Sequence, residues 1–318
     1  MDNKFRPTVG DIATLSRLTG IHYPVLFLLR RYVIIVSGAT GGIGSETAKH
    51  LALRDARVYL SGRSTEKIEQ TMARLNNDAG RDLDLHALRM DLEDLQSVKS
   101  AAGEFMRCES RLDILINNAG VRRLHRQWQV NYLAPHTLTS YLMPLLLATA
   151  TKTGGSMDRV RVVNVSSDAA WQGPMAIDMD DVNLTKEKGT MAGWRRYGHA
   201  KQALIRDTKS FNDRHSSQGV TAYSLHPGIV ATGLQSGDQG AFGKITRPLT
   251  KYLSFSTTLD ASYNTFFAAT SKDAVADAGR FFMPVGKLEP KADGFIKDTA
   301  GNDALWELGN RQMRKILG

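Results

Sequence analysis

The most informative residues of this chain are a tyrosine and a lysine four positions apart, in Tyr197-Gly198-His199-Ala200-Lys201. On a helix, residues i and i+4 lie on one face, so the phenol and the ammonium group point the same way. A cation beside a buried tyrosine favours the phenolate and lowers the pKa of the phenol, which can then exchange a proton near neutral pH. The same spacing also occurs on ordinary helix surfaces, so its weight depends on the segments that accompany it.

A glycine-rich segment far upstream gives the tyrosine–lysine pair more weight. Tyr32–Val36 is β-branched and apolar, as is typical of a strand buried on both faces, and a helical pattern begins at Ser45. Between the two, glycines let the backbone turn sharply and approach a pyrophosphate, and the helix N-terminus offers free N–H groups. A plain tight turn is the alternative, but a strand before and a helix after are the context of a dinucleotide-binding site. The candidate cofactor-binding residues here are Gly38, Gly42, Ile43 and Gly44.

Strand-like and helix-like segments alternate along the rest of the chain, which predicts an α/β fold with a parallel sheet covered by helices on both faces. Strands are expected at Tyr32–Ser37, Arg57–Ser61, Leu83–Met90, Leu112–Asn117, Val160–Ser166, Val220–His226 and Arg280–Pro284. Helices are expected at Ile43–Asp55, Thr65–Asn77, Leu95–Cys108, Gln127–Ala150, Gly193–His215 and Thr258–Ser271. We expect a single doubly wound sheet of the Rossmann type, with strand order 3-2-1-4-5-6-7.

The expected domain covers residues 32–318 and follows an N-terminal extension, residues 1–31. Within that extension, Ile21–Arg31 has six apolar residues beside two arginines and looks inserted. It is interpreted as a short membrane-surface anchor, an extra packing segment or a misassigned splice boundary. A glycine-rich stretch at about 231–257 follows the end of a strand, where ligands bind in such sheets, and is either a mobile substrate loop or a plain surface loop.

Composition excludes several classes of protein. No stretch approaches the ~20 apolar residues of a membrane span. Cys108 is the only cysteine, so no intramolecular disulfide is expected, and a reducing, cytoplasmic compartment is indicated. The net charge is +9, but the basic clusters are short and scattered and carry no nucleic-acid-binding signature, so nucleic acid is not an expected partner. The eight histidines form no metal-spaced cluster, and no metal is expected.

The choice of cofactor is argued from charge. In NAD enzymes, an acidic residue about 20 positions after the glycines accepts hydrogen bonds from the ribose 2′-hydroxyl. Here the second strand ends in Ser61-Gly62-Arg63, with an arginine nineteen residues after Gly44. A 2′-phosphate needs such a cation, so NADP is predicted. A solvated arginine that opens the next helix is the competing interpretation.

Taken together, the motifs resemble those of the short-chain dehydrogenase/reductase family from about Val33 to the end of the chain. The matching segments are Gly38-Ala39-Thr40-Gly41-Gly42-Ile43-Gly44, Asp91-Leu92, Asn117-Asn118-Ala119-Gly120, Asn131, Val165-Ser166-Ser167, Tyr197 with Lys201, and His226-Pro227-Gly228. The segments around Tyr197 and His226 are similar to the retinol-dehydrogenase-like branch. The tail at Phe281–Lys287 resembles fungal members of that branch, many of which act in secondary metabolism.

The resemblance implies a role for each site residue. Tyr197 would be the proton donor or acceptor, Lys201 would lower its pKa and bind the nicotinamide ribose, and Ser167 would hydrogen-bond the substrate oxygen. Either serine of the Ser166-Ser167 pair could face the substrate, although the family usually uses the second. Asn131 would hold a water that links Lys201 to solvent; a helix-interior asparagine bonded to local backbone is the alternative. The other cofactor contacts implied by the family are Asp91 to adenine, Asn118 to the adenosine ribose, and Val230 and Thr232 to the nicotinamide amide.

The expected function is therefore the NADP(H)-dependent interconversion of a carbonyl and an alcohol on a small lipophilic substrate. Trp171, Met175 and Phe242 are either residues of the substrate pocket or simply packing residues. The segment between Gly120 and Asn131 is shorter than in relatives, which puts the position of Asn131 in doubt. A catalytically impaired nucleotide-binding scaffold of the same fold is therefore the alternative. The oligomeric state stays open.

Overall fold

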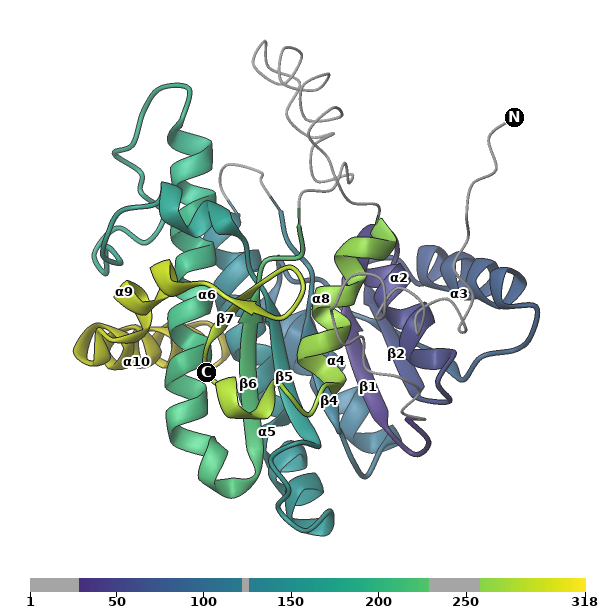
Figure 1. The fold of residues 1–318 in the computed structure, drawn as a ribbon. Helices are drawn as coiled ribbons and strands as arrows, with labels where there is room; N and C mark the ends of the chain where they lie inside the picture. Colours follow the sequence, from purple (N-terminus) through teal and green to yellow (C-terminus); the bar gives the residue numbers. More distant parts are fainter. Residues whose placement is uncertain (1–28, 122–125, 229–257) are drawn as a thin grey trace, which may run out of the picture.

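The computed structural model describes residues 29–121, 126–228 and 258–318. Its strands are β1 (Val33–Ser37), β2 (Arg57–Gly62), β3 (Leu85–Arg89), β4 (Ile114–Asn117), β5 (Val160–Val165), β6 (Val220–Leu225), β7 (Phe281–Met283) and β8 (Lys287–Leu288). They form one sheet in the order β3-β2-β1-β4-β5-β6-β7-β8 (Figure 1). Pairing is parallel from β3 to β7, and β8 adds to β7 in the antiparallel sense. The predicted strand order is confirmed, and β8 extends it by one strand.

Helices cover both faces of this sheet, because the strands bury side chains on both sides. Along β1, Val33 and Ile35 belong to one core cluster, whereas Ile34 and Val36 belong to the other. The first cluster is closed by α4 (Leu95–Cys108), α5 (Ala134–Lys152) and α6 (Ala192–His215). The second is closed by α2 (Gly42–Ala52), α3 (Thr65–Ala79) and α8 (Thr258–Thr270). This two-sided burial explains the continuous apolar runs of the strands.

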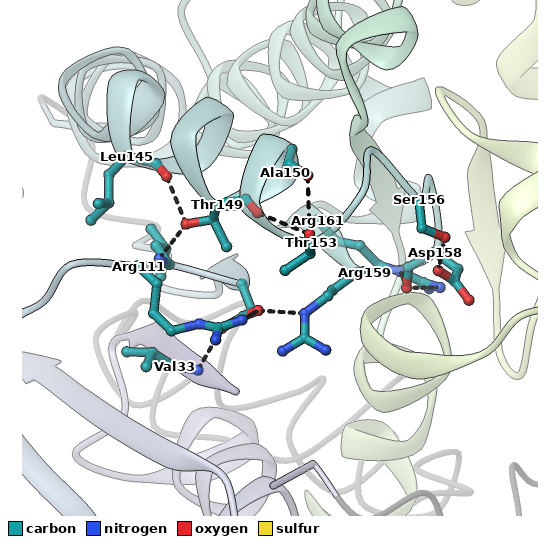
Figure 2. Close-up of polar contacts among 12 residues, drawn as sticks. Val33, Arg111, Leu145, Thr149, Ala150, Thr153, Ser156, Asp158, Arg159 and Arg161 are labelled. Atoms are coloured by element: carbon teal, nitrogen blue, oxygen red, sulfur yellow. Dashed lines mark hydrogen bonds and ion pairs between the residues drawn. The ribbon is translucent and has the colours of Figure 1, made fainter. Parts of the chain in front are cut away.

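At the amino ends of the strands, one buried carboxylate holds several elements in register. Asp113 accepts a hydrogen bond from the Val33 backbone N–H (2.9 Å) at the start of β1. Arg111 (2.8 Å) and Arg159 (2.9 Å) donate to the same carboxylate, and Figure 2 shows both side chains converging beside Val33. The carboxylate therefore fixes β1 against the segments that lead into β4 and β5. Because these strands are parallel neighbours, their carboxyl ends then lie at one edge of the sheet.

Two features of the helices differ from the sequence prediction. The expected helix Gln127–Ala150 begins with a π-helical turn, η1 (Gln129–Leu133), before α5. After β8 come α9 (Asp293–Ile296) and α10 (Thr299–Leu317), which were not predicted. Figure 1 shows α10 (yellow) beside α6 (green), and its Leu305 and Leu308 belong to the core cluster of α4, α5 and α6.

Of the apparent insert Ile21–Arg31, only the last three residues lie in the described part of the chain. Leu29 is buried in the core cluster that contains Ile34, and its N–H donates to the Arg54 carbonyl (2.7 Å). Arg30 forms an exposed ion pair with Asp55. Within the described ranges, none of the helices combines the length and apolarity that crossing a bilayer requires.

Candidate active site

The glycine turn after β1 adopts a conformation that only small residues allow. Gly38 and Gly42 have φ angles of +65° and +58°, in the left-handed region that favours glycine. A Cβ on Gly44 would lie 2.5 Å from both the Asn118 side-chain nitrogen and the Gly38 carbonyl oxygen. The turn is therefore packed directly against the residues that follow β4, and a side chain at Gly44 would disrupt this contact.

The turn leads directly into the N-terminus of α2. No side chain of the described residues caps α2 at Gly41, and the first turn, which includes the half-buried Ile43, carries no acidic residue. By contrast, Ser64 caps α3 and Asp94 caps α4. An uncapped helix N-terminus behind a glycine turn fits an anionic group such as a pyrophosphate.

The carboxyl ends of β4 and β3 bring two further predicted residues to this edge. The Ser37 hydroxyl accepts hydrogen bonds from the N–H groups of Asn118 (3.0 Å) and Ala119 (3.1 Å), and the Asn118 amide donates to the Ser37 carbonyl (2.9 Å). Asp91 follows β3 and accepts a bond from the Glu93 N–H (3.0 Å). Both residues therefore lie at strand ends, as their proposed contacts with adenosine require.

Arg63 lies at the tip of β2, but it is not an isolated cation. Its side chain is 62% exposed and lies 3.6 Å from the carboxylate of Glu93, whose other oxygen pairs with Arg126. Two guanidinium groups thus share one carboxylate, so positive charges outnumber negative charges within this three-residue cluster. Sequence reasoning missed Glu93 and Arg126, because only folding brings them to the end of the second strand.

The tyrosine and the lysine of α6 lie together, as their spacing predicted. The ammonium nitrogen of Lys201 lies 5.8 Å from the ring centroid of Tyr197, and both side chains are buried. Lys201 donates a hydrogen bond to the carbonyl of Val165, the last residue of β5 (2.8 Å). Burial lowers the pKa of the Lys201 ammonium to about 7. This lysine can therefore change its charge near neutral pH.

The two serines after β5 have different partners. The Ser166 hydroxyl donates to the carbonyl of Lys201 (2.7 Å), so it ties the strand end to α6. The Ser167 hydroxyl caps η2 (Asp168–Gln172) by accepting from the Ala169 N–H (3.1 Å), and it donates to the Asp168 carboxylate (3.1 Å). The half-exposed Asp168 carboxylate lies 3.6 Å from Nδ1 of His226, a neighbour that the sequence did not indicate.

Glycine also allows α6 to approach the serine segment closely. A Cβ on Gly198, between Tyr197 and Lys201, would lie 2.2 Å from the Ala169 carbonyl oxygen and 2.8 Å from the Gly173 nitrogen. Next to it, His199 accepts from the Asp178 N–H and donates to the Val182 carbonyl, each at 3.1 Å. Gly198 and His199, which lie between Tyr197 and Lys201 on α6, therefore fix the position of α6 against the neighbouring segments.

Asn131 lies in the π-helical turn η1 and is fully buried. Its amide donates to the Val121 carbonyl and accepts from the Val121 N–H, each at 2.8 Å. A Cβ on Gly120 would lie 3.3 Å from the Asn131 side-chain oxygen and 3.4 Å from the Lys201 nitrogen. The side-chain oxygen of Asn131 and the nitrogen of Lys201 therefore both lie close to Gly120, despite the short segment that precedes Asn131.

Some predicted residues lie outside the part of the chain that the structure describes, and others pack elsewhere or are exposed. Val230, Thr232, Phe242 and the whole stretch 231–257 lie outside the described residues. Trp171 packs on Phe281 and Phe295, with ring centroids 5.4 and 5.9 Å away, which favours a packing role. Met175 is 85% exposed.

Comparison with known proteins places this arrangement in a family. The model of short chain dehydrogenases matches residues 32–177. The short-chain dehydrogenase/reductase drtF of Aspergillus calidoustus is 33% identical over 302 residues, 89% of this chain and 94% of the relative. Human retinol dehydrogenase 13 is 34% identical over 312 residues, 92% of this chain and 89% of the relative.

A solved structure agrees at the level of the fold. A short-chain dehydrogenase from Burkholderia cenocepacia, determined in complex with NADP, superposes with a TM-score of 0.62 at 22% identity, covering 82% of this chain and 99% of that chain. The resemblance to fungal and retinol-dehydrogenase-like members is thereby confirmed by relatives that extend over nearly the whole chain. The chain belongs to the short-chain dehydrogenase/reductase family, whose members are oxidoreductases that act on CH–OH groups with NAD(P).

Proposed function

We propose that this enzyme interconverts a carbonyl and an alcohol on a small lipophilic substrate with NADP(H), and that Tyr197, Lys201, Ser167 and Asn131 carry the chemistry. The observation that supports this most strongly is the buried Lys201 beside Tyr197, next to the strand end that carries Ser167. A desolvated amine with a pKa of about 7 would modulate a neighbouring phenol at physiological pH.

The residues of this site suit a nicotinamide dinucleotide. The glycine turn and the uncapped N-terminus of α2 would hold its pyrophosphate, Asn118 and Asp91 its adenosine, and Lys201 its nicotinamide ribose. Val230 and Thr232 are proposed for the nicotinamide amide by family analogy. When bound, the reduced nicotinamide supplies a hydride to the substrate carbon.

The chain's own groups would handle the proton and the developing charge. In the reductive direction, the Tyr197 hydroxyl gives its proton to the substrate oxygen, and the new C–H bond and O–H bond complete the alcohol. Ser167 redirects its hydroxyl from Asp168 to that oxygen and stabilises its negative charge. The proton that Tyr197 loses is replaced through Lys201, with Asn131 holding the water that connects Lys201 to solvent.

The preference for NADP is supported by the charge at the tip of β2. Arg63 and Arg126 share the single carboxylate of Glu93, which leaves a positive charge for a 2′-phosphate. A lipophilic substrate and a role in secondary metabolism are suggested by the retinol dehydrogenase and the fungal enzymes to which the chain is similar. Residues 32–318 as the catalytic domain, the stretch at 231–257 as a substrate loop and a cytoplasmic location stay predictions.

The alternative is a nucleotide-binding scaffold that has lost activity. The short segment before Asn131 favours this alternative, because it could displace Asn131 from the site. Since Asn131 and Lys201 both lie close to Gly120, the structure supports a proton relay through these two residues instead.

The test uses the full chain, NADPH and a panel of ketones and aldehydes of increasing lipophilicity. NADPH oxidation is expected with part of the panel and is expected to fall by at least about 10²-fold in Tyr197→Phe, because general acid–base catalysis contributes about 10²- to 10⁴-fold. NADPH binding without turnover on any carbonyl would support the scaffold. A Tyr197→Phe variant as active as the parent would remove the mechanism.

A further inference from the structure

We propose that the C-terminal helix α10 positions Asn131 for its part in proton transfer, through Trp128 and Tyr132, although none of the contacts described for α10 involves Tyr197, Lys201 or Ser167. The inference rests on the proposed function, because it assigns a supporting role to the relay that Asn131 would form with Lys201. It concerns the π-helical turn η1 and the unpredicted helix that packs behind it.

Two residues near Asn131 are bonded to α10: Tyr132, which follows it, and Trp128, the N-cap residue of η1. The Tyr132 hydroxyl donates to the backbone carbonyl of Leu305 (3.0 Å), and the Trp128 indole N–H donates to the side-chain oxygen of Gln312 (3.0 Å). The two rings are buried and lie 4.5 Å apart. Two hydrogen bonds about two helical turns apart on α10 therefore hold the turn that carries Asn131.

The surface of α10 is shaped for this contact. A Cβ on Gly309 would lie only 2.6 Å from the Tyr132 hydroxyl and 3.1 Å from the His136 ring nitrogen Nε2. Any larger residue at this position would push the tyrosine away from the helix backbone. Leu305 and Leu308, which flank the contact, are buried in the adjoining core cluster. The close approach of α10 is therefore fitted to Tyr132 of η1 and His136 of α5.

On its other side, the same turn contacts the catalytic helix. The Trp128 ring stacks on His199, with centroids 5.3 Å apart, and His199 lies between Tyr197 and Lys201 on α6. Asn131 itself is bonded at both ends of its amide to Val121. Thus η1 and the Trp128 that precedes it are held between α6 and α10, and the asparagine side chain lies close to Gly120.

A π-helical turn is less stable than an α-helical turn, and it persists only when its surroundings hold it. The contacts from α10 supply that support. Tyr132, Trp128 and Gln312 are accordingly positioning residues, which act through Asn131.

The experiment is a double-mutant cycle between Tyr132→Phe and Asn131→Ala, measured as kcat, KM for NADPH and the pH profile of kcat. In the parent, Tyr132→Phe is expected to lower kcat about fivefold, the equivalent of one net hydrogen bond, with KM for NADPH unchanged. In the Asn131→Ala background it is expected to have no further effect, because the group that it positions is gone. Equal losses in both backgrounds would overturn the proposal and leave Tyr132 a purely structural residue.

Matched variants separate positioning from general stability. Gln312→Leu removes the acceptor for Trp128 and is expected to lower kcat, whereas Gln312→Glu keeps an acceptor and is expected to retain it. Asp303→Asn removes the ion pair of α10 with Arg214, away from η1, and is expected to leave kcat unchanged. A loss of kcat in Asp303→Asn equal to that in Gln312→Leu would contradict the proposal.

A second readout does not depend on turnover. Hydrogen–deuterium exchange of the amides in residues 129–133 is expected to rise in Tyr132→Phe and Gln312→Leu, but not in Asp303→Asn. Unchanged exchange in the first two variants would also overturn the proposal. Failure of the proposed function gives a different result from failure of this proposal. If the proposed function fails, Tyr197→Phe would retain full activity, whether or not the amides of residues 129–133 exchange faster in Tyr132→Phe and Gln312→Leu.

Discussion

The hydroxyl of Ser166 donates a 2.7 Å hydrogen bond to the backbone carbonyl of Lys201, and this bond separates the roles of two adjacent serines. Ser166 is committed to joining β5 to α6. Among the described residues, the hydroxyl of Ser167 bonds to the half-exposed Asp168 carboxylate and to the Ala169 N–H of its own helix cap, so it is the hydroxyl that we expect a substrate to recruit.

Replacement of each serine by alanine is expected to give different defects. Ser167→Ala removes the donor to the substrate oxygen and is expected to lower kcat by about 10²-fold or more. Ser166→Ala is expected to reduce the free energy of unfolding by about 0.5 to 1.5 kcal/mol, because it removes one buried hydrogen bond between the end of β5 and α6, with a smaller effect on kcat. Steady-state kinetics and urea unfolding of both variants check this. The reverse pattern would assign the substrate contact to Ser166.

The buried Lys201 predicts how stability changes with pH. Its pKa is lowered to about 7 in the folded chain, while the unfolded chain keeps the ordinary value of 10.5. Between these values the unfolded state binds more protons, so the contribution of Lys201 to the free energy of unfolding rises with pH, by up to about 1.4 kcal/mol per unit. Urea unfolding of the parent and Lys201→Met between pH 7 and 9.5 measures this. The two curves should converge or cross with rising pH, and parallel curves would show that the lysine is not desolvated.

His136 predicts a dependence of the opposite sign. Burial lowers the pKa of its imidazole, but the Asp207 carboxylate on α6, with Asn310 and Glu307 on α10, outweighs this and raises the pKa above 6.5. The stabilisation is therefore fully present below pH 6.5 and is lost as the pH rises through the folded value. The stability difference between the parent and His136→Gln should be largest near pH 6 and should shrink toward pH 9. A constant difference would contradict the charged pair.

Cofactor choice should respond to the cluster at the tip of β2. Arg63→Ala is expected to lower kcat/KM for NADPH about 10- to 100-fold with little effect on NADH, because a hydrogen bond to a charged phosphate contributes about 1.5 to 3 kcal/mol. Glu93→Gln releases both Arg63 and Arg126 and is expected to lower KM for NADPH. Arg74→Ala, an exposed arginine paired with Asp78 on α3, serves as the control. Equal losses with both cofactors would argue against a phosphate contact.

The closeness of α6 and η2 makes Gly198 sensitive to any side chain. Gly198→Ala would place a Cβ 2.2 Å from the Ala169 carbonyl, so the two elements must separate. We expect a loss of about 1 to 3 kcal/mol in stability and a fall in kcat of at least tenfold. Gly103→Ala on α4 is the control, because its nearest neighbour would be 3.9 Å away and helix propensity should make it neutral or slightly stabilising. Similar behaviour of the two variants would show that η2 can move without cost.

Much of the fold was predictable because its strands are buried on both faces. Such strands appear as uninterrupted apolar runs, as in Val33–Val36, and the glycines and helices between them mark the turns. Helix α4 begins and ends at the predicted residues, Leu95 and Cys108, and Asp94 caps its N-terminus in the structure. The last helix was missed although Asp298 at its N-cap, with Leu305 and Leu308 three residues apart, carried a usable signal.

The site was less predictable where it depends on contacts between distant segments. The Tyr197–Lys201 pair follows from helical spacing alone, but the position of Asn131 depends on a π-helical turn that no residue pattern announced. Likewise, Glu93 meets Arg63 only because β2 and β3 end at the same edge of the sheet. Ser166 and Ser167 differ because the Ser166 hydroxyl bonds to the backbone carbonyl of Lys201 in α6, a contact that the sequence does not reveal.

The burial of Leu305 and Leu308 against α4, α5 and α6 has a consequence for biosynthesis. Domains begin to fold from the N-terminus as they are translated, and the glycine turn and the first strands leave the ribosome early. The hydrophobic face that α10 covers stays open to water until its residues emerge about 170 positions after Asn131. Until then, the apolar side chains of this face are exposed in the nascent chain, and exposed apolar surface of this kind makes a folding intermediate prone to aggregation.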